Sequence, residues 1–221
     1  SCRRRPASSA LNLLDTGPRR YDKLKFILLL VLMPWLGACS MGQMVARTSV
    51  SIMDGNVDAM NRESDMVLAE AAIPANLKLI EGLIAEDPNN PELLALAAQG
   101  FYGYAFGFAD LSDPQRAAAL YARGYAYGVR ALRAFGLDID LAIASPDAID
   151  SAVAGMRAAA IPALFWTASC QAKQIDLDRS DPGRIAQLAS TERLMARVRE
   201  LQPDYYFGGV HLFYGVYYGG R

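Results

Sequence analysis

Leu120-Tyr121-Ala122-Arg123-Gly124-Tyr125-Ala126-Tyr127-Gly128-Val129-Arg130 decides the fold class of this 221-residue chain. Asp113-Pro114 precedes the stretch and Gly136 follows it. Pro suits the first turn of a helix and Gly the position just after its end, so the sequence predicts one helix between them. Gly124 and Gly128 lie four residues apart and therefore on one face of that helix. Each Gly costs a helix roughly 1 kcal/mol relative to Ala. We therefore expect another helix or a ligand to approach the backbone there, between aromatic walls.

Helical periodicity extends on both sides of this stretch, and almost no strand signal is present. Beyond the helix at about 114–135, we expect helices at about 91–109, 147–156, 161–175 and 182–201, a linker at 137–146, and a last helix from 205 to the end. Ala117, Tyr121 and Gly124 match the small-aromatic-small spacing in the second helix of a tetratricopeptide repeat, although other consensus positions are missing. The sequence thus predicts an all-α fold of stacked antiparallel helical hairpins, a degenerate tetratricopeptide-like α-solenoid.

Aromatic and glycine residues recur together in three places, at 101–107, 124–128 and 213–219. Aromatics at such positions are core residues by default, but a subset is expected to line a pocket or channel. The candidate lining residues are Tyr102, Tyr104, Phe106, Arg123, Tyr125, Tyr127, Phe165 and Trp166. Arg123 and Arg130 share a helix face. They either bind an anionic ligand or an acidic partner, or simply face the solvent.

The beginning of the chain indicates export. Basic residues precede a short apolar run that ends in Leu36-Gly37-Ala38-Cys39, the order typical of a secretory signal. The last four residues resemble a bacterial lipobox, in which Cys39 would carry lipid. We therefore expect a spurious or disordered extension at 1–22, a lipoprotein signal peptide at 23–38 and the helical-repeat domain at 39–221. Ser40 in place of Asp indicates the periplasmic face of the outer membrane in a Gram-negative bacterium.

The charge of the chain is divided unevenly between these segments. Lys and Arg number 22 and Asp and Glu 23, but residues 1–38 hold seven basic and two acidic residues. Residues 39–221 are left with 15 basic and 21 acidic residues, a net charge of about −6. Because nucleic-acid binding needs clustered cations on the folded part, we expect no nucleic-acid partner.

Residues with obvious chemistry are few. The only histidine, His211, is interpreted as a packed helix residue, and Cys170 as a small buried apolar one. One histidine and one available thiol do not make a metal site, and no nucleophile, phosphate-loop or dinucleotide motif is present. We therefore predict neither enzymatic activity nor a cofactor.

Several segments resemble one known family, the TRAP transporter-associated T components (TatT family). The specific parts are Tyr-x-Arg-Gly-x-x-Tyr-Gly at 121–128 and Leu-Phe-Trp at 164–166. The other parts that carry the resemblance are 92–96, 104–108, 116–117, 129–132, 162–163, 201–206 and 208–209. Family members continue into further helices, so the resemblance implies that this chain is C-terminally truncated.

The resemblance implies a non-enzymatic periplasmic lipoprotein. Such a protein docks the solute-binding (P) component of a TRAP-type transporter and passes its ligand through an oligomeric helical platform, for which the family suggests a trimer. The membrane is contacted through the lipid anchor only. Two alternatives stay open, namely a generic tetratricopeptide lipoprotein for envelope assembly and a carrier that binds a hydrophobic ligand directly.

Overall fold

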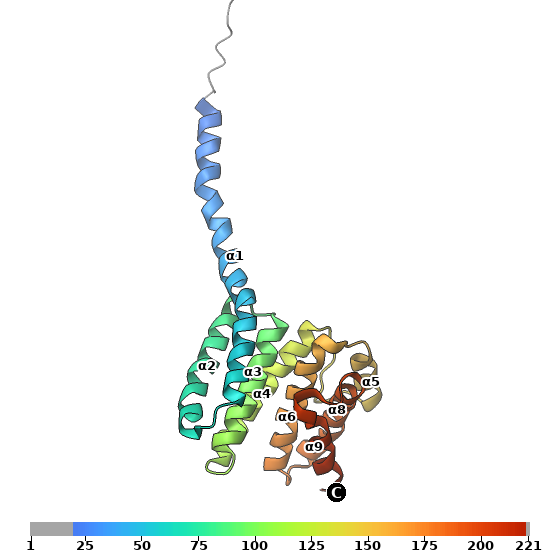
Figure 1. The fold of residues 1–221 in the computed structure, drawn as a ribbon. Coiled ribbons are helices and arrows are strands. Elements are labelled where there is room, and N and C mark those ends of the chain that lie inside the picture. The colour runs from blue at the N-terminus through green and yellow to red at the C-terminus, as the bar shows by residue number, and fades with distance from the viewer. Residues whose placement is uncertain (1–19, 220–221) are drawn as a thin grey trace, which may run out of the picture. The chain divides into compact units, whose positions relative to one another are not determined.

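The computed structural model describes the backbone of residues 20–219 and the side chains of residues 41–219. It contains two compact units, Ser1–Met41 and Gly42–Arg221, and helix α1, Arg20–Asn61, contributes to both (Figure 1). The predicted signal peptide and Cys39 lie outside the residues whose side chains are described, and the predicted domain boundaries stay predictions.

Helices make up the whole regular structure of the second unit, and its described residues contain no strand, which confirms the all-α class. After α1 the chain forms α2 (Met66–Glu86), α3 (Pro91–Tyr104), the π-helical turn η1 (Ala105–Ala109), α4 (Pro114–Ala134), α5 (Pro146–Ala154), the 3-10 turn η2 (Ala158–Ala160), α6 (Ile161–Leu177), α7 (Pro182–Ala186), α8 (Leu188–Leu201) and α9 (Tyr205–Gly219) (Figure 1).

Helices α3, α4, α5 and α7 begin in the same way, with a polar side chain that caps the first turn and Pro at the first helical position. Asn90, Asp113, Ser145 and Asp181 each accept a hydrogen bond from a backbone N–H one turn ahead. Gly136 follows α4 with a φ of +99°, the left-handed conformation that Gly adopts without strain. The X-Pro and Gly signals in the sequence therefore gave the correct boundaries for α3, α4 and α5 to within a few residues.

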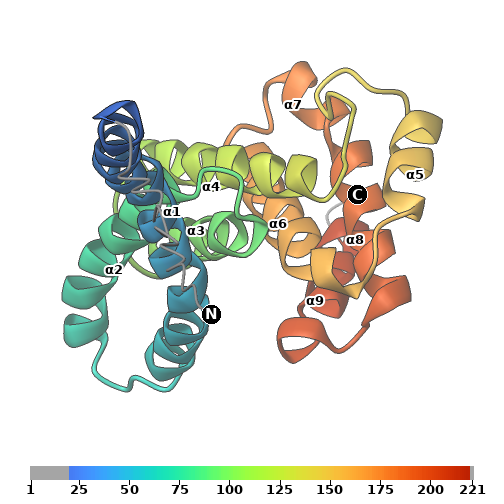
Figure 2. The same cartoon turned by 90° about the horizontal axis from the view of Figure 1, so that it is seen from above.

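Helices α3, α4 and α6 form the centre of the second unit. Helix α4 packs against both α3 and α6, α2 covers α3, and α8 covers α6 and contacts α5 (Figure 2). The main buried cluster joins Leu93 and Leu94 of α3 with Leu164 and Trp166 of α6 and Leu194 of α8. Neighbouring elements thus share one apolar core, while the finer classification as a tetratricopeptide-like solenoid stays a prediction.

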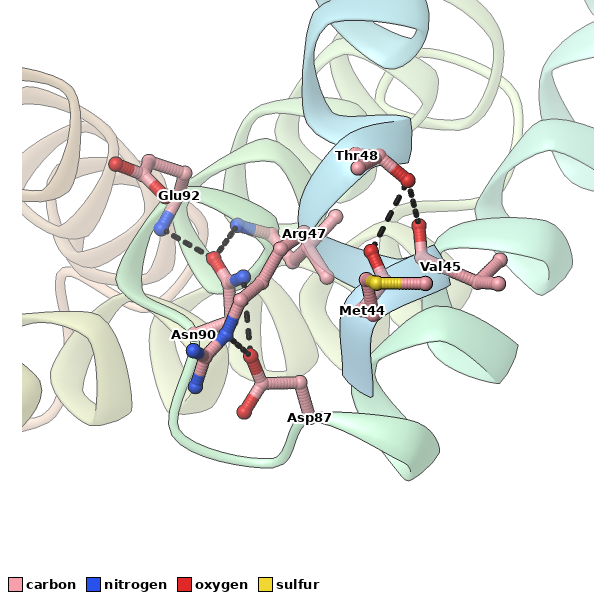
Figure 3. A network of polar contacts seen from close by, with 8 residues as sticks. Met44, Val45, Arg47, Thr48, Asp87, Asn90 and Glu92 are labelled. Atoms are coloured by element: carbon pink, nitrogen blue, oxygen red, sulfur yellow. Dashed lines mark hydrogen bonds and ion pairs between the residues drawn. The ribbon is translucent and has the colours of Figure 1, made fainter. Parts of the chain in front are cut away.

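An ion pair ties the C-terminal part of α1 to the turn between α2 and α3. Arg47 Nε donates to Asp87 Oδ2 at 2.9 Å, and Asn90 Nδ2 donates to the same oxygen at 3.4 Å (Figure 3). The Oδ1 atom of Asn90 accepts from the backbone N–H groups of Glu92 and Leu93 (Figure 3). The nearly buried Asp87 therefore orients the residue that caps α3.

The predicted single helix at 182–201 is wrong, because Gln187 separates α7 from α8. The carbonyl of Gln187 accepts hydrogen bonds from Ser190 Oγ at 2.7 Å and Thr191 Oγ1 at 3.1 Å. Such side-chain bonds offer the backbone an alternative to a continuous helix.

The last helix also differs from the prediction. Tyr206, Phe207 and Gly208 have φ values of 46°, 58° and 73°, so α9 begins with a left-handed segment and becomes regular only after it. Left-handed conformations cost roughly 1–2 kcal/mol for each non-glycine residue. Burial of the Tyr206 ring against Trp166, with ring centres 4.6 Å apart, offsets part of that cost.

Candidate functional site

Gly124 lies where α4 contacts α3 and α6, and Gly128 lies where α4 contacts α6. A Cβ atom on Gly124 would lie 2.7 Å from Cys170 Sγ and 3.2 Å from the carbonyl oxygen of Ala98. A Cβ atom on Gly128 would lie 2.2 Å from Thr167 Oγ1 and 3.1 Å from the Cα atom of Thr167. The prediction of a close helix contact at this pair is therefore confirmed.

The equivalent pair at Gly103 and Gly107 behaves differently. A Cβ atom added to either residue would have no heavy atom within 4 Å, and both glycines are exposed. The same spacing of glycines thus serves helix packing on α4 and leaves an open surface at the end of α3.

Seven aromatic side chains gather between α3, α4, α6 and the start of α9, and we call them the aromatic cluster. Neighbouring ring centres lie 4.6–6.3 Å apart, within the range of favourable aromatic pairs. The members are Tyr102, Phe106, Tyr121, Phe165, Trp166, Tyr205 and Tyr206. Four of the eight predicted lining residues are therefore together, and Phe106, 57% exposed, brings the cluster to the surface.

Polar atoms inside the aromatic cluster are only partly satisfied. The Tyr121 hydroxyl is buried without a hydrogen-bond partner. Burial raises the pKa of Tyr102 to about 12 and that of Tyr205 to about 12, so both phenols are neutral at physiological pH. The cluster thus offers apolar ring surface and one unpaired hydroxyl, and it carries no charge of its own.

Lys173 borders the cluster and is held by carboxylates. Its Nζ lies 2.7 Å from Asp110 Oδ2 and 3.2 Å from Asp176 Oδ2, and 5.7 Å from the centre of the Phe106 ring. Burial lowers the pKa of Lys173, but the hydrogen bonds to the two carboxylates outweigh this and raise it above its ordinary value. Lys173 is therefore a charged, anchored residue and not a base.

The other predicted residues lie apart from the cluster. Tyr127 stacks on Phe101 and donates to Glu81 Oε1 at 2.8 Å, and Arg123 donates to the same oxygen. Lys78 Nζ donates to Glu81 Oε2 at 2.8 Å. Burial raises the pKa of Glu81, but the three donors outweigh burial and hold the pKa below its ordinary value. The sequence pattern does not predict this role of Glu81, because Glu81 is one polar position in an otherwise ordinary amphipathic helix.

Tyr104 and Tyr125 occupy two further environments. Tyr104 faces Phe108 and Arg116 on the side of α3 away from the cluster. Tyr125 accepts a long hydrogen bond of 3.5 Å from Gln171 Nε2, whose Oε1 accepts in turn from Ser190 and Thr191 of α8. The structure therefore distributes the eight predicted lining residues over separate environments, and their joint role as a channel lining stays a prediction.

Two surface depressions of about 590 Å³ and about 300 Å³ lie elsewhere. The first is bordered by residues 136–140 with Arg133, and the second by Pro114, Gln174 and Arg184 among others. Neither is lined by any of the eight predicted residues. A passage along the aromatic residues would therefore need a surface beyond these depressions.

Groups suited to catalysis are scarce in the described part of the chain. Cys170 is buried, as predicted, and burial raises the pKa of its thiol far above the ordinary value, so it is no nucleophile. The interpretation of His211 as a packed residue is wrong, because its side chain is exposed on α9. Over the residues that the structure describes, no cluster of three or more His, Cys, Asp or Glu is placed to hold a metal ion.

Of the helices in the described residues, none has both the length and the apolar content needed to cross a bilayer.

Comparison with known proteins identifies one family. A family model described as TRAP transporter T-component matches residues 62–221, which cover α2 to the end of the chain. Comparison with curated proteins gives no match.

Proposed function

Because the chain belongs to the TRAP transporter T-component family, we propose that it is a periplasmic lipoprotein scaffold that docks the solute-binding (P) component of a TRAP-type transporter. Membership of the family implies a role in TRAP transport in the bacterial envelope. The observation that carries the proposal is the extent of the match over residues 62–221, which includes the helices that carry the aromatic cluster. The proposed role is non-enzymatic.

A surface on α9 supports a role in protein contact. Phe207 is 90% exposed, and Leu212 and Val216, one turn apart on the same face, are 74% and 62% exposed. Large apolar side chains that gather in this way on a surface are typical of interaction sites.

The aromatic cluster supports the passage of an apolar ligand. It reaches the surface at Phe106, and no member of the cluster lines either of the two described depressions. A ligand path along these rings would thus form between copies of the chain, which agrees with the homo-oligomer, a trimer, that the family resemblance implies.

The membrane anchor in this proposal is lipid on Cys39, after cleavage of the signal peptide at 23–38. Two acyl chains on one residue give stable membrane attachment without a spanning helix. The helical unit would then face the periplasm from the outer membrane, where a soluble solute-binding protein can reach it.

Co-purification tests the proposal. The full chain, tagged at its C-terminus and expressed in its own bacterium, is solubilised in mild detergent and its bound proteins are identified. We expect a TRAP solute-binding protein among them at near-equal amounts. Recovery of outer-membrane or pilus assembly proteins without a solute-binding protein would support an envelope-assembly role instead. Recovery of a co-purifying lipid and no protein would support a carrier.

A further inference from the structure

Helix α4 carries three arginines at seven-residue spacing, Arg116, Arg123 and Arg130, which we call the arginine row. Seven residues are nearly two helical turns, so the three side chains lie on one face and the row spans about 21 Å. Each guanidinium lies over an aromatic ring. The pairs, with the distance from the guanidinium carbon to the ring centre, are Arg116 on Tyr104 at 5.4 Å, Arg123 on Phe101 at 4.6 Å and Arg130 on Tyr127 at 5.3 Å.

The hydrogen-bonding capacity of the arginine row is largely unused. A guanidinium has five N–H donors, and the side chain of each arginine in the row makes one hydrogen bond in the described structure. The acceptors are the Tyr104 hydroxyl at 3.1 Å for Arg116, Glu81 for Arg123 and the carbonyl of Pro88 at 2.9 Å for Arg130. Of the three arginines in the row, only Arg123 has a carboxylate partner among the described residues.

Stacking on the rings prepares these side chains for binding. An arginine that lies on an aromatic ring has already given up much of its rotamer freedom, and its planar fork matches a carboxylate with two parallel hydrogen bonds. Arg116 and Arg123 are exposed, and Arg130 is half-buried. The row is therefore a set of ordered cations with donors left for an outside partner.

The charge around the arginine row differs from that of the domain. Residues 39–221 have 15 basic and 21 acidic residues, a net of about −6. Next to the row, Lys78 of α2 adds a fourth cation. The carboxylate of Glu81 pairs with both Lys78 and Arg123 and neutralises part of this positive charge. Asp113 is close to Arg116, but its side chain accepts from the backbone N–H of Arg116 and caps α4. An acidic partner, repelled by the net charge of the domain, is attracted to this face.

We propose that the arginine row is the docking face for an acidic surface of the solute-binding protein. This inference rests on the proposed function, since it names the part of the chain that meets that partner. The partner surface presents carboxylates along about 21 Å, either on an extended segment of roughly six residues or along a helix of about four turns.

The experiment measures the affinity of the full-length chain in detergent for the purified solute-binding protein of the same bacterium. The test variant is Arg116→Gln with Arg130→Gln, which removes two cations without a carboxylate partner and leaves the Arg123–Glu81 pair intact. The control is Arg62→Gln with Arg157→Gln, which removes the same charge from two exposed arginines outside the row. A third variant, Arg116→Lys with Arg130→Lys, keeps the charge and loses the planar fork. Circular dichroism melts establish that all three are folded.

We expect the test variant to bind about tenfold more weakly than the wild type and to lose much of the salt dependence between about 50 and 300 mM. The control should stay within about twofold of the wild type, and the lysine variant should fall between the two. Equal affinity and equal salt dependence of wild type and test variant would overturn the inference and leave the proposed function standing. Failure of the wild type itself to bind would overturn both.

Discussion

Gly128→Ala tests the close contact between α4 and the backbone of α6 at Thr167. The new Cβ atom would lie 2.2 Å from Thr167 Oγ1, 3.0 Å from its Cβ and 3.1 Å from its Cα. Rotation of the side chain cannot relieve the last two contacts, and Thr167 Oγ1 is itself held by a hydrogen bond to the carbonyl of Ala163 at 2.6 Å. Overpacking of a rigid core costs about 3 kcal/mol at the upper end of its usual range, and the better helix propensity of Ala returns about 1 kcal/mol. We therefore expect a loss of about 2 kcal/mol.

Gly103→Ala is the matched control. It is the same chemical change in the same kind of aromatic-glycine motif, but no heavy atom lies within 4 Å of its new Cβ. The substitution should stabilise the protein by about 0.5–1 kcal/mol, because it restricts the unfolded chain and removes a glycine from a helix.

Urea unfolding followed by circular dichroism at 222 nm measures both variants, with thermal melts as a check. For a domain of this size, a loss of about 2 kcal/mol lowers Tm by about 4–8 °C. Thr167→Ala removes the nearest atom, so the double variant with Gly128→Ala should lose less stability than the sum of the two single changes. If Gly128→Ala stabilises the protein as Gly103→Ala does, the helices do not meet at this residue and the reasoning fails.

Three further predictions concern single side chains. Glu81→Gln removes a carboxylate with three donors and should lower the free energy of unfolding by about 1 kcal/mol at pH 7. Although burial raises its pKa, hydrogen bonds lower the pKa of Glu81 from the ordinary 4.5, so its stabilisation is present above about pH 4.5 and lost as the pH falls through the folded-state value. Urea titrations at neutral and acidic pH should therefore show the difference between variant and wild type shrinking toward acid, and a difference that grows would contradict the assignment. In a chain with Cys2 and Cys39 changed to Ser, a disulfide reagent should label Cys170 only on unfolding, since burial raises the pKa of its thiol; rapid native labelling would contradict its burial. Cys39→Ser should abolish incorporation of labelled palmitate and move the protein out of the membrane fraction, and unchanged labelling would rule out Cys39 as the lipid site.

Local signals in the sequence were enough to predict most helix boundaries. Asp113-Pro114 and Gly136 marked the ends of α4, because capping and the left-handed φ of +99° depend on nearby residues only. The cost of Gly124 and Gly128 in a helix likewise indicated a close contact before any neighbour was known. The identities of the neighbours, Ala98 and Cys170 for Gly124 and Thr167 for Gly128, depend on tertiary packing that no local pattern encodes.

The errors at α7–α8 and α9 have the same origin. Ser190 and Thr191 continue an amphipathic pattern, but their hydroxyls bond to the carbonyl of Gln187 and to Gln171 of α6, and the helix breaks. Tyr206 adopts a left-handed conformation because its ring packs on Trp166, 40 residues away in the chain. Contacts between distant segments override local preference at both places.

The candidate site was predictable in composition and not in arrangement. Tyr102, Phe106, Phe165 and Trp166 come together, while Arg123 of α4 lies over Phe101, outside the cluster. Neighbouring residues of α3 point to different faces of the helix. The positions of the aromatic residues in the sequence do not by themselves show which neighbouring helix each ring will contact.

Sedimentation velocity of the full chain with the solute-binding protein of the same bacterium tests the central claim most directly. At micromolar concentrations of both proteins, we predict a faster-sedimenting species that contains both and dissociates as salt is raised. Two independent boundaries at every concentration and at low salt, with both proteins folded by circular dichroism, would contradict the proposal that this chain docks the solute-binding protein.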